Sequence, residues 1–200
     1  MVPEPIPRGR LEALPLFFRA DDLESIGFSR HQIPSLVRRR FAVRVGRGLY
    51  QREGLPTTEL EGLLMTARMA PHGIFCLLTA LRFHEIGTQS PPDVWIALPH
   101  KARVPSVAPW RGRFVRWSGT SLTYGIEDRT VLGVRFRITS PARTVVDCFR
   151  YRNKVGLDVA LEAARDGLRD HVTTVDAVVD AAKACRIWGV MRPYLEGALS

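Results

Sequence analysis

Residues 28–52 read FSRHQIPSLVRRRFAVRVGRGLYQR. Ser29 suits the cap of a helix, because its hydroxyl can accept a backbone N–H that the first turn leaves unpaired. Apolar residues then recur at the i, i+3, i+4 spacing of one helical face: Ile33, Leu36 and Val37. Pro34 lacks the N–H that would bond the carbonyl of Arg30, so this predicted helix is either kinked or begins a residue or two later.

A β-hairpin is predicted directly after this helix. Residues 41–45 alternate like a strand, residues 46–48 form a Gly-containing turn, and residues 49–51 return. Upstream, the sequence predicts a short strand at 16–18 and a short helix at 21–26 that ends at Gly27. The order of helix, turn, second helix and hairpin is that of a winged helix-turn-helix. Its expected core residues in the second helix and hairpin are Ile33, Leu36, Val37, Val43, Val45 and Tyr50.

Positive charge is concentrated in the same stretch. Residues 28–52 hold seven arginines and no acid, and the 200-residue chain carries a formal charge of +9. Such a segment fits a DNA duplex, where arginines neutralise phosphates and side chains at the start of the second helix meet base edges. Arg47 at the wing would reach the backbone or the minor groove. A solvated cationic face is the alternative. The candidate DNA-binding residues are Ser29, Arg30, His31, Gln32, Ser35, Arg38, Arg39, Arg44 and Arg47.

The rest of the chain predicts a larger α+β domain. Gly54-Leu55-Pro56 marks a boundary, so we expect a DNA-binding domain at 1–54 and a second domain with a small sheet and several helices at 55–200. Ser140, followed by Pro141, predicts the start of one of these helices. The expected helices are 57–70, 75–86, 140–151, 156–168, 174–186 and 189–198. The expected strands are 94–98, 114–117 and 131–139, the last as one strand or as a bent hairpin arm around Gly133.

Catalytic and metal-binding patterns are not found. There is no P-loop, no GxGxxG, no Gly-x-Ser-x-Gly and no HExxH, and we expect neither a cofactor nor an enzymatic activity. Asp147 is a lone acid, expected to pair with Arg143 or Arg150. Three cysteines without metal-ligand spacing, Cys76, Cys148 and Cys185, are expected to be buried thiols.

Two further expectations concern partners. The basic stretch 101–116 is either a second surface for a polyanion or a basic loop between strands. No apolar run approaches the roughly 20 residues that a membrane-spanning helix needs, and residues 1–5 lack the apolar core of a signal peptide. We therefore expect a cytoplasmic protein with no membrane partner.

Several segments resemble the AbiEi-type antitoxins of type IV toxin–antitoxin systems: residues 28–32 with 43–50, 138–154, and 191–195. The resemblance implies a non-enzymatic, two-domain autorepressor whose N-terminal domain binds inverted repeats upstream of its own operon. It also implies a C-terminal domain that supports cooperative repression, with self-association on DNA. This domain would counteract a nucleotidyltransferase-like toxin, and the neutralisation does not require a stable complex between the two proteins. Arg19 and Arg40 stand where the family usually has a capping Thr and a Gly.

Two other functions stay open. One is an orphan winged-helix regulator with a sensor domain. The other is a degenerate nuclease-like enzyme, which Asp93 and the basic stretch favour and the missing acid–acid–Lys arrangement opposes.

Overall fold

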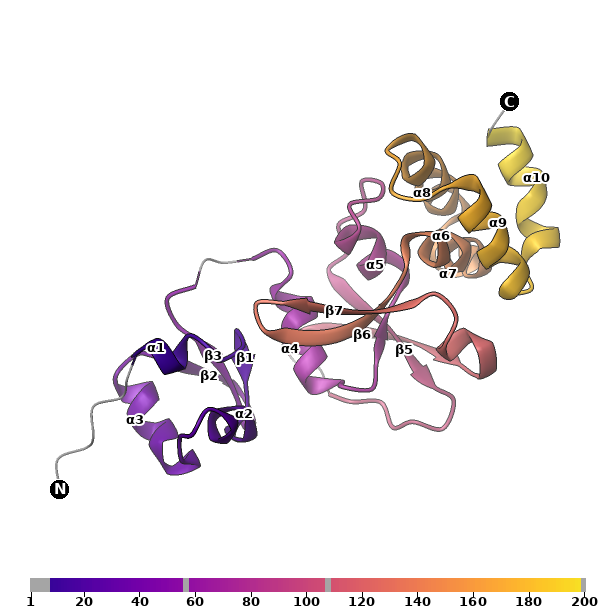
Figure 1. Ribbon diagram of the computed structural model, residues 1–200. Coiled ribbons are helices and arrows are strands. Elements are labelled where there is room, and N and C mark those ends of the chain that lie inside the picture. The colour runs from indigo at the N-terminus through magenta and orange to yellow at the C-terminus, as the bar shows by residue number, and fades with distance from the viewer. Residues whose placement is uncertain (1–7, 56–57, 107–108, 199–200) are drawn as a thin grey trace, which may run out of the picture. The chain divides into compact units, whose positions relative to one another are not determined.

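The computed structural model describes residues 8–55, 58–106 and 109–198 (Figure 1). The chain divides into two compact units, Met1–Met69 with Thr130–Arg135, and Ala70–Arg129 with Phe136–Ser200. Both units mix helices with strands, so the predicted α+β class is confirmed.

In its described residues, the first unit combines four short α-helices and one 3-10 helix with a small antiparallel sheet. Its elements are α1 (Arg8–Leu11), β1 (Phe17–Phe18), α2 (Ala20–Ser25), the 3-10 helix η1 (Arg30–Gln32), α3 (Ile33–Arg38), β2 (Ala42–Gly46), β3 (Leu49–Arg52) and α4 (Glu61–Met69). The strand order is β1-β3-β2, and Phe18 lies opposite Tyr50. The element order α2, η1–α3, β2–β3 is the predicted helix, turn, helix and hairpin.

The core of the first unit contains two of the residues predicted for it, Ile33 and Leu36, together with residues of the neighbouring elements. Leu23 of α2, Ile33 and Leu36 of η1–α3, and Ala42 of β2 are buried together with Phe18. Burial of each large apolar side chain stabilises the fold by roughly 1.5–3 kcal/mol, so these few contacts hold the short helices in place.

Helix α4 belongs to the first unit, although the Gly54–Pro56 punctuation predicts a boundary before it. The reason is local: α4 packs against β1, and Arg68 forms an ion pair with Asp22 of α2. Asp22 also accepts the backbone N–H of Arg19, the N-cap residue of α2, at 2.7 Å, which is one bond of a capping box.

The second unit builds a five-stranded mixed sheet in the order β6-β5-β4-β8-β7. Its strands are β4 (Ile74–Phe75), β5 (Asp93–Pro99), β6 (Arg111–Trp117), β7 (Ile126–Val131) and β8 (Val134–Thr139). β5 pairs with β6 in parallel and with β4 antiparallel, while β4 and β8 are parallel. The tip of the β7–β8 hairpin, Thr130–Arg135, is assigned to the first unit.

Helices surround α6, as Figure 1 shows within this unit. The described helices of the second unit are α5 (Leu77–Phe83), the 3-10 helix η2 (Gly119–Leu122), α6 (Pro141–Arg150), α7 (Arg152–Val155), α8 (Leu157–Arg169), α9 (Val175–Ala184) and α10 (Trp188–Ala198). Ser140 caps α6 by accepting the N–H of Arg143, with Pro141 in the first turn as predicted. α6 contacts α5, α8, α9 and α10, which makes it the central helix of the unit. No helix in the described part of the chain is long and apolar enough to cross a bilayer.

Two predicted elements were wrong in part. The helix expected at 75–86 begins only at Leu77, because Ile74 and Phe75 form the buried strand β4, which pairs on both sides. The stretch 131–139, expected as a strand or as a bent hairpin arm around Gly133, is the end of β7, a turn and β8, so the hairpin is confirmed and the single strand is wrong. Leu132 and Gly133 between β7 and β8 both take positive φ angles, 48° and 76°, which turn the chain.

Candidate nucleic-acid interface

The second helix of the motif begins with a capping box. The Ser29 hydroxyl accepts the N–H of His31 at 3.3 Å, and the Gln32 side chain accepts the N–H of Ser29 at 2.8 Å. The first turn, η1, is a 3-10 turn, and α3 continues from Ile33 with Pro34 in its first turn. The helix therefore begins later rather than kinking, because a proline at this position removes no hydrogen bond that the helix needs.

Arg30 is held by acids of α2. Its Nε donates to Glu24 Oε1 at 2.7 Å and its Nη2 to Glu24 Oε2 at 3.0 Å, while Asp21 lies 3.9 Å away. The hydrogen bonds from Arg30 lower the pKa of the exposed Glu24 carboxyl. A contact from Arg30 to a base would thus have to replace its two hydrogen bonds to Glu24. The sequence alone did not indicate this pairing.

The other predicted arginines are exposed. Arg38 and Arg39 lie at the end of α3, and Arg44 and Arg47 lie on the adjoining hairpin, with Arg47 in its turn. Within the described residues none of these four forms an ion pair. Arg44 donates only to the carbonyl of Gly46, at 3.3 Å. Since α3 contacts β2, the fold brings these four cationic side chains onto neighbouring elements.

The remaining predicted contacts vary in exposure. Ser29 and His31 are exposed, whereas Gln32 and Ser35 are half-buried. Arg40 is exposed too and takes a φ of 56°, the left-handed conformation for which a helix-ending glycine was expected.

Two residues predicted as core were wrong. Val37 is 37% exposed and Val43 43% exposed, while Val45 and Tyr50 are half-buried. The short α3 buries Leu36 and Ile33 and leaves the next apolar position outside. The alternation of strand β2 turns Ala42 inward, and Val43 lies on the solvent side.

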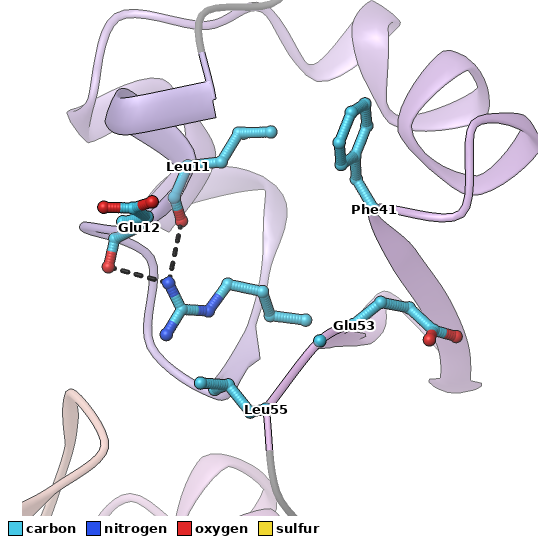
Figure 2. Close-up of a pocket in the computed structure, with 7 residues that line it drawn as sticks. Leu11, Glu12, Phe41, Glu53 and Leu55 are labelled. Atoms are coloured by element: carbon cyan, nitrogen blue, oxygen red, sulfur yellow. Dashed lines mark hydrogen bonds between the residues drawn. The ribbon is translucent and has the colours of Figure 1, made fainter.

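Arg52 has a structural role. Its Nη1 donates to the backbone carbonyls of Leu11 at 3.2 Å and Glu12 at 2.8 Å, so it ties β3 to the end of α1 (Figure 2). Arg52 also borders a hollow of about 450 Å³. The other residues around this hollow are Leu11, Glu12, Phe41, Glu53, Gly54 and Leu55.

Two cations of the second basic stretch, Arg113 and Arg116, are bound within the protein. Arg113 Nε pairs with Asp93 Oδ2 at 2.7 Å, and Arg116 Nη1 donates to the carbonyls of Pro99 at 2.9 Å and Ala102 at 2.6 Å. These bonds favour the interpretation of residues 101–116 as a basic connection between β5 and β6. The exposed cations left in it are Lys101, Arg103 and Arg111.

Asp147 pairs with Arg143, as expected, and both side chains are fully buried. Arg143 Nε donates to Asp147 Oδ2 at 2.9 Å, and its guanidinium lies 4.7 Å from the ring centre of Trp117. Burial raises the pKa of the Asp147 carboxyl to about 6, against the opposing effect of Arg143. Asp147 Oδ1 has no hydrogen-bond partner among the described residues. The pair joins α6 to the segment before β7, because Arg143 also donates to the carbonyl of Tyr124 at 2.7 Å.

The cysteines are buried and free, as predicted. Burial raises the pKa of the Cys148 thiol. No group of three or more His, Cys, Asp or Glu side chains that could hold a metal ion occurs in the part of the chain that the structure describes.

Comparison with known proteins identifies a solved structure with a similar fold. No protein-family model matches the chain, and no curated protein matches it in sequence. Among solved structures the chain is similar to the RV2827C protein from Mycobacterium tuberculosis, with a TM-score of 0.58 and 13% identity. The match covers 91% of this chain and 74% of that chain. It shows a shared mixed α+β fold, in which N-terminal helices with a small antiparallel sheet precede a larger mixed sheet and its helices.

Proposed function

We propose that the first unit binds double-stranded DNA and that the protein is a transcriptional autorepressor and antitoxin. The observation that carries the DNA-binding part is a group of exposed arginines on α3 and the hairpin that form no ion pair with any described residue: Arg38, Arg39, Arg44 and Arg47. An uncompensated cationic surface of this kind gains affinity for DNA by releasing counterions from the phosphates.

The winged-helix arrangement supports a specific docking. Helix η1–α3 lies in the major groove, where the side chains of its first turn meet base edges, and the hairpin lies over the backbone or the minor groove. The exposed Val37 fits this arrangement, because an apolar side chain in the major groove can contact a thymine methyl group.

The finer assignment depends on the resemblance of residues 28–32, 43–50 and 138–154 to AbiEi-type antitoxins, together with the shared fold. On this proposal the DNA is a pair of inverted repeats upstream of the protein's own operon, and two copies self-associate there. The second unit counteracts a nucleotidyltransferase-like toxin without a stable complex, and the protein has no catalytic activity of its own. Asp93, the acid that favoured a nuclease, is engaged by Arg113.

A gel-shift assay on the upstream region tests the DNA-binding part. We expect a specific shift from the full chain, and we expect Arg47→Ala to weaken it on every sequence alike, because a phosphate contact carries no base information. Arg169→Ala is the matched control, since Arg169 is an exposed arginine of the second unit that is already paired with Asp166 and Asp170.

A protein that gives no shift, or whose affinity drops equally in both variants, would contradict the proposal. Co-expression with the neighbouring gene tests the antitoxin part. Rescue of growth from a downstream toxin is expected, and unchanged toxicity would refute this part while leaving DNA binding intact.

A further inference from the structure

A hollow of about 280 Å³ opens in the second unit, and none of its lining residues belongs to the proposed DNA interface. It is formed where the end of β6 and η2 meet the last residues of α6 and α9. Its lining residues are Ser118, Gly119, Thr120, Ser121, Arg150, Ala184, Cys185 and Arg186. The lining thus combines three hydroxyl side chains with two guanidinium groups and includes no acidic residue.

Arg150 is fixed at the hollow by neutral partners. Its Nη1 donates to Ser121 Oγ at 3.2 Å, and its Nη2 donates to the backbone carbonyl of Cys185. These acceptors orient the half-buried guanidinium without neutralising it. Arg150 therefore brings to the hollow a positive charge whose direct hydrogen-bond partners are neutral, while the buried Asp147 carboxylate is close enough to interact with it electrostatically.

Ser121, on the η2 side of the hollow, is held in place by the buried pair of Arg143 and Asp147. Arg143 Nη2 donates to the carbonyl of Ser121 at 3.3 Å, while Arg143 Nε pairs with Asp147. Asp147 does not line the hollow, and one of its carboxylate oxygens is bound by Arg143. The anchoring of Ser121 at both its carbonyl and its hydroxyl fixes the loop before a ligand arrives, which reduces the entropy lost on binding.

The other polar side chains that line the hollow are available to donate hydrogen bonds to a ligand. Arg186 is exposed, and its guanidinium forms neither an ion pair nor a hydrogen bond with another described residue. Thr120 is exposed, and the hydroxyl of Ser118, the residue before η2, makes no capping bond. These side chains supply hydrogen-bond donors on both sides of the opening.

We propose that this hollow binds the phosphate group of a small phosphorylated molecule. Guanidinium groups donate two hydrogen bonds in the geometry that phosphate oxygens accept, and hydroxyls donate to the remaining oxygens. The recess favours a small molecule over duplex DNA, because the phosphates of a duplex lie on a convex surface that exposed, projecting side chains reach more readily. This inference does not depend on the proposed DNA binding, since every residue of the hollow belongs to the second unit.

Isothermal titration of the full chain at constant ionic strength tests the proposal, with inorganic phosphate and adenosine 5′-monophosphate as the probes. We expect saturable binding of at least one of them. Arg186→Gln and Thr120→Val should each weaken this binding, the arginine variant by at least about tenfold, because it loses a charge-assisted hydrogen bond. Neither exposed side chain supports the fold, so the unfolding temperatures should stay unchanged.

Arg165→Gln is the matched control, because it removes an exposed arginine of the same unit that does not line the hollow. Full retention of phosphate binding in this control supports the assignment. Absence of saturable binding, or an equal loss in Arg186→Gln and Arg165→Gln, overturns it.

A gel shift with duplex DNA separates the two sources of phosphate. Unchanged DNA affinity in Arg186→Gln, with weakened phosphate binding, supports a small-molecule site. Weakened DNA affinity in Arg186→Gln without any binding of the free phosphates identifies a backbone contact and overturns the proposal. Failure of the full chain to bind DNA, with phosphate binding retained, refutes only the proposed function.

Discussion

At the scale of single residues, the buried pair of Arg143 and Asp147 makes the stability of the protein depend on pH. Both side chains are fully buried, and Asp147 Oδ1 lacks a hydrogen-bond partner among the described residues. Arg143 compensates only one carboxylate oxygen. The burial of the other explains why the pKa of Asp147 is raised rather than lowered by its ion pair.

This pKa predicts a pH dependence of folding. The carboxyl of Asp147 shifts from its ordinary value of 3.8 to about 6 in the native state, so between these values the native state binds more protons than the unfolded state. The contribution of Asp147 to the free energy of unfolding should therefore be largest below pH 4. It should fall by about 3 kcal/mol as the pH rises to 6 and then level off.

Urea unfolding of the wild type and Asp147→Asn between pH 3.5 and 7 measures this contribution. The asparagine cannot titrate, so the difference in unfolding free energy between the two proteins should shift against the wild type as the pH rises. Parallel stability curves for the two proteins would contradict the raised pKa.

At the scale of elements, the start of the recognition helix has two roles that one substitution can separate. Gln32 accepts the N–H of Ser29 as part of the capping box and is also a candidate base contact. Gln32→Ala should cost about 1 kcal/mol of stability through the lost cap, so a change in its DNA binding would be ambiguous.

Gln32→Glu resolves this ambiguity. A glutamate can keep the bond to the N–H of Ser29 and places negative charge at the start of a helix, so the stability should stay close to that of the wild type. The same charge should weaken DNA binding at least about tenfold, because it faces phosphates and cannot donate to adenine. Thermal unfolding and gel shifts on the same preparations provide the measurement, and unchanged DNA affinity would place Gln32 outside the interface.

The elements also show which sequence signals suffice to predict structure. The helix caps at Ser29 and Ser140 and the glycine turn of the hairpin were predicted, since each depends on local chemistry. Strand β4 was missed because an apolar pair next to an apolar helix carries no distinguishing period. β7 was missed because its Glu-Asp-Arg-Thr centre is polar, and its place in the sheet depends on pairing with β8.

At the scale of the whole molecule, the arginine content of the candidate interface was predictable, and the partners that these arginines bind within the protein were not. The seven arginines of residues 28–52 are evident in the sequence. Two of them have partners that only the fold supplies, Arg30 through Glu24 of α2 and Arg52 through the carbonyls at the end of α1. Long-range contacts of this kind leave no periodic trace in the sequence, so the count of arginines overstates the charge available to DNA.

The reduced set of arginines makes a quantitative prediction for the intact protein on DNA. If the five exposed arginines that lack such a long-range partner, Arg38, Arg39, Arg40, Arg44 and Arg47, each neutralise one phosphate, the logarithm of the binding constant should fall with the logarithm of salt concentration with a slope of about −4.5 per bound protomer. Affinity should then drop roughly five-hundredfold per protomer between 50 and 200 mM KCl. Fluorescence anisotropy with a labelled upstream duplex measures this slope, and replacement of all five arginines by glutamine should bring it close to zero. A steep slope that survives the fivefold replacement would assign the phosphate contacts to other cations, with Lys101, Arg103 and Arg111 of the second unit as the first to test.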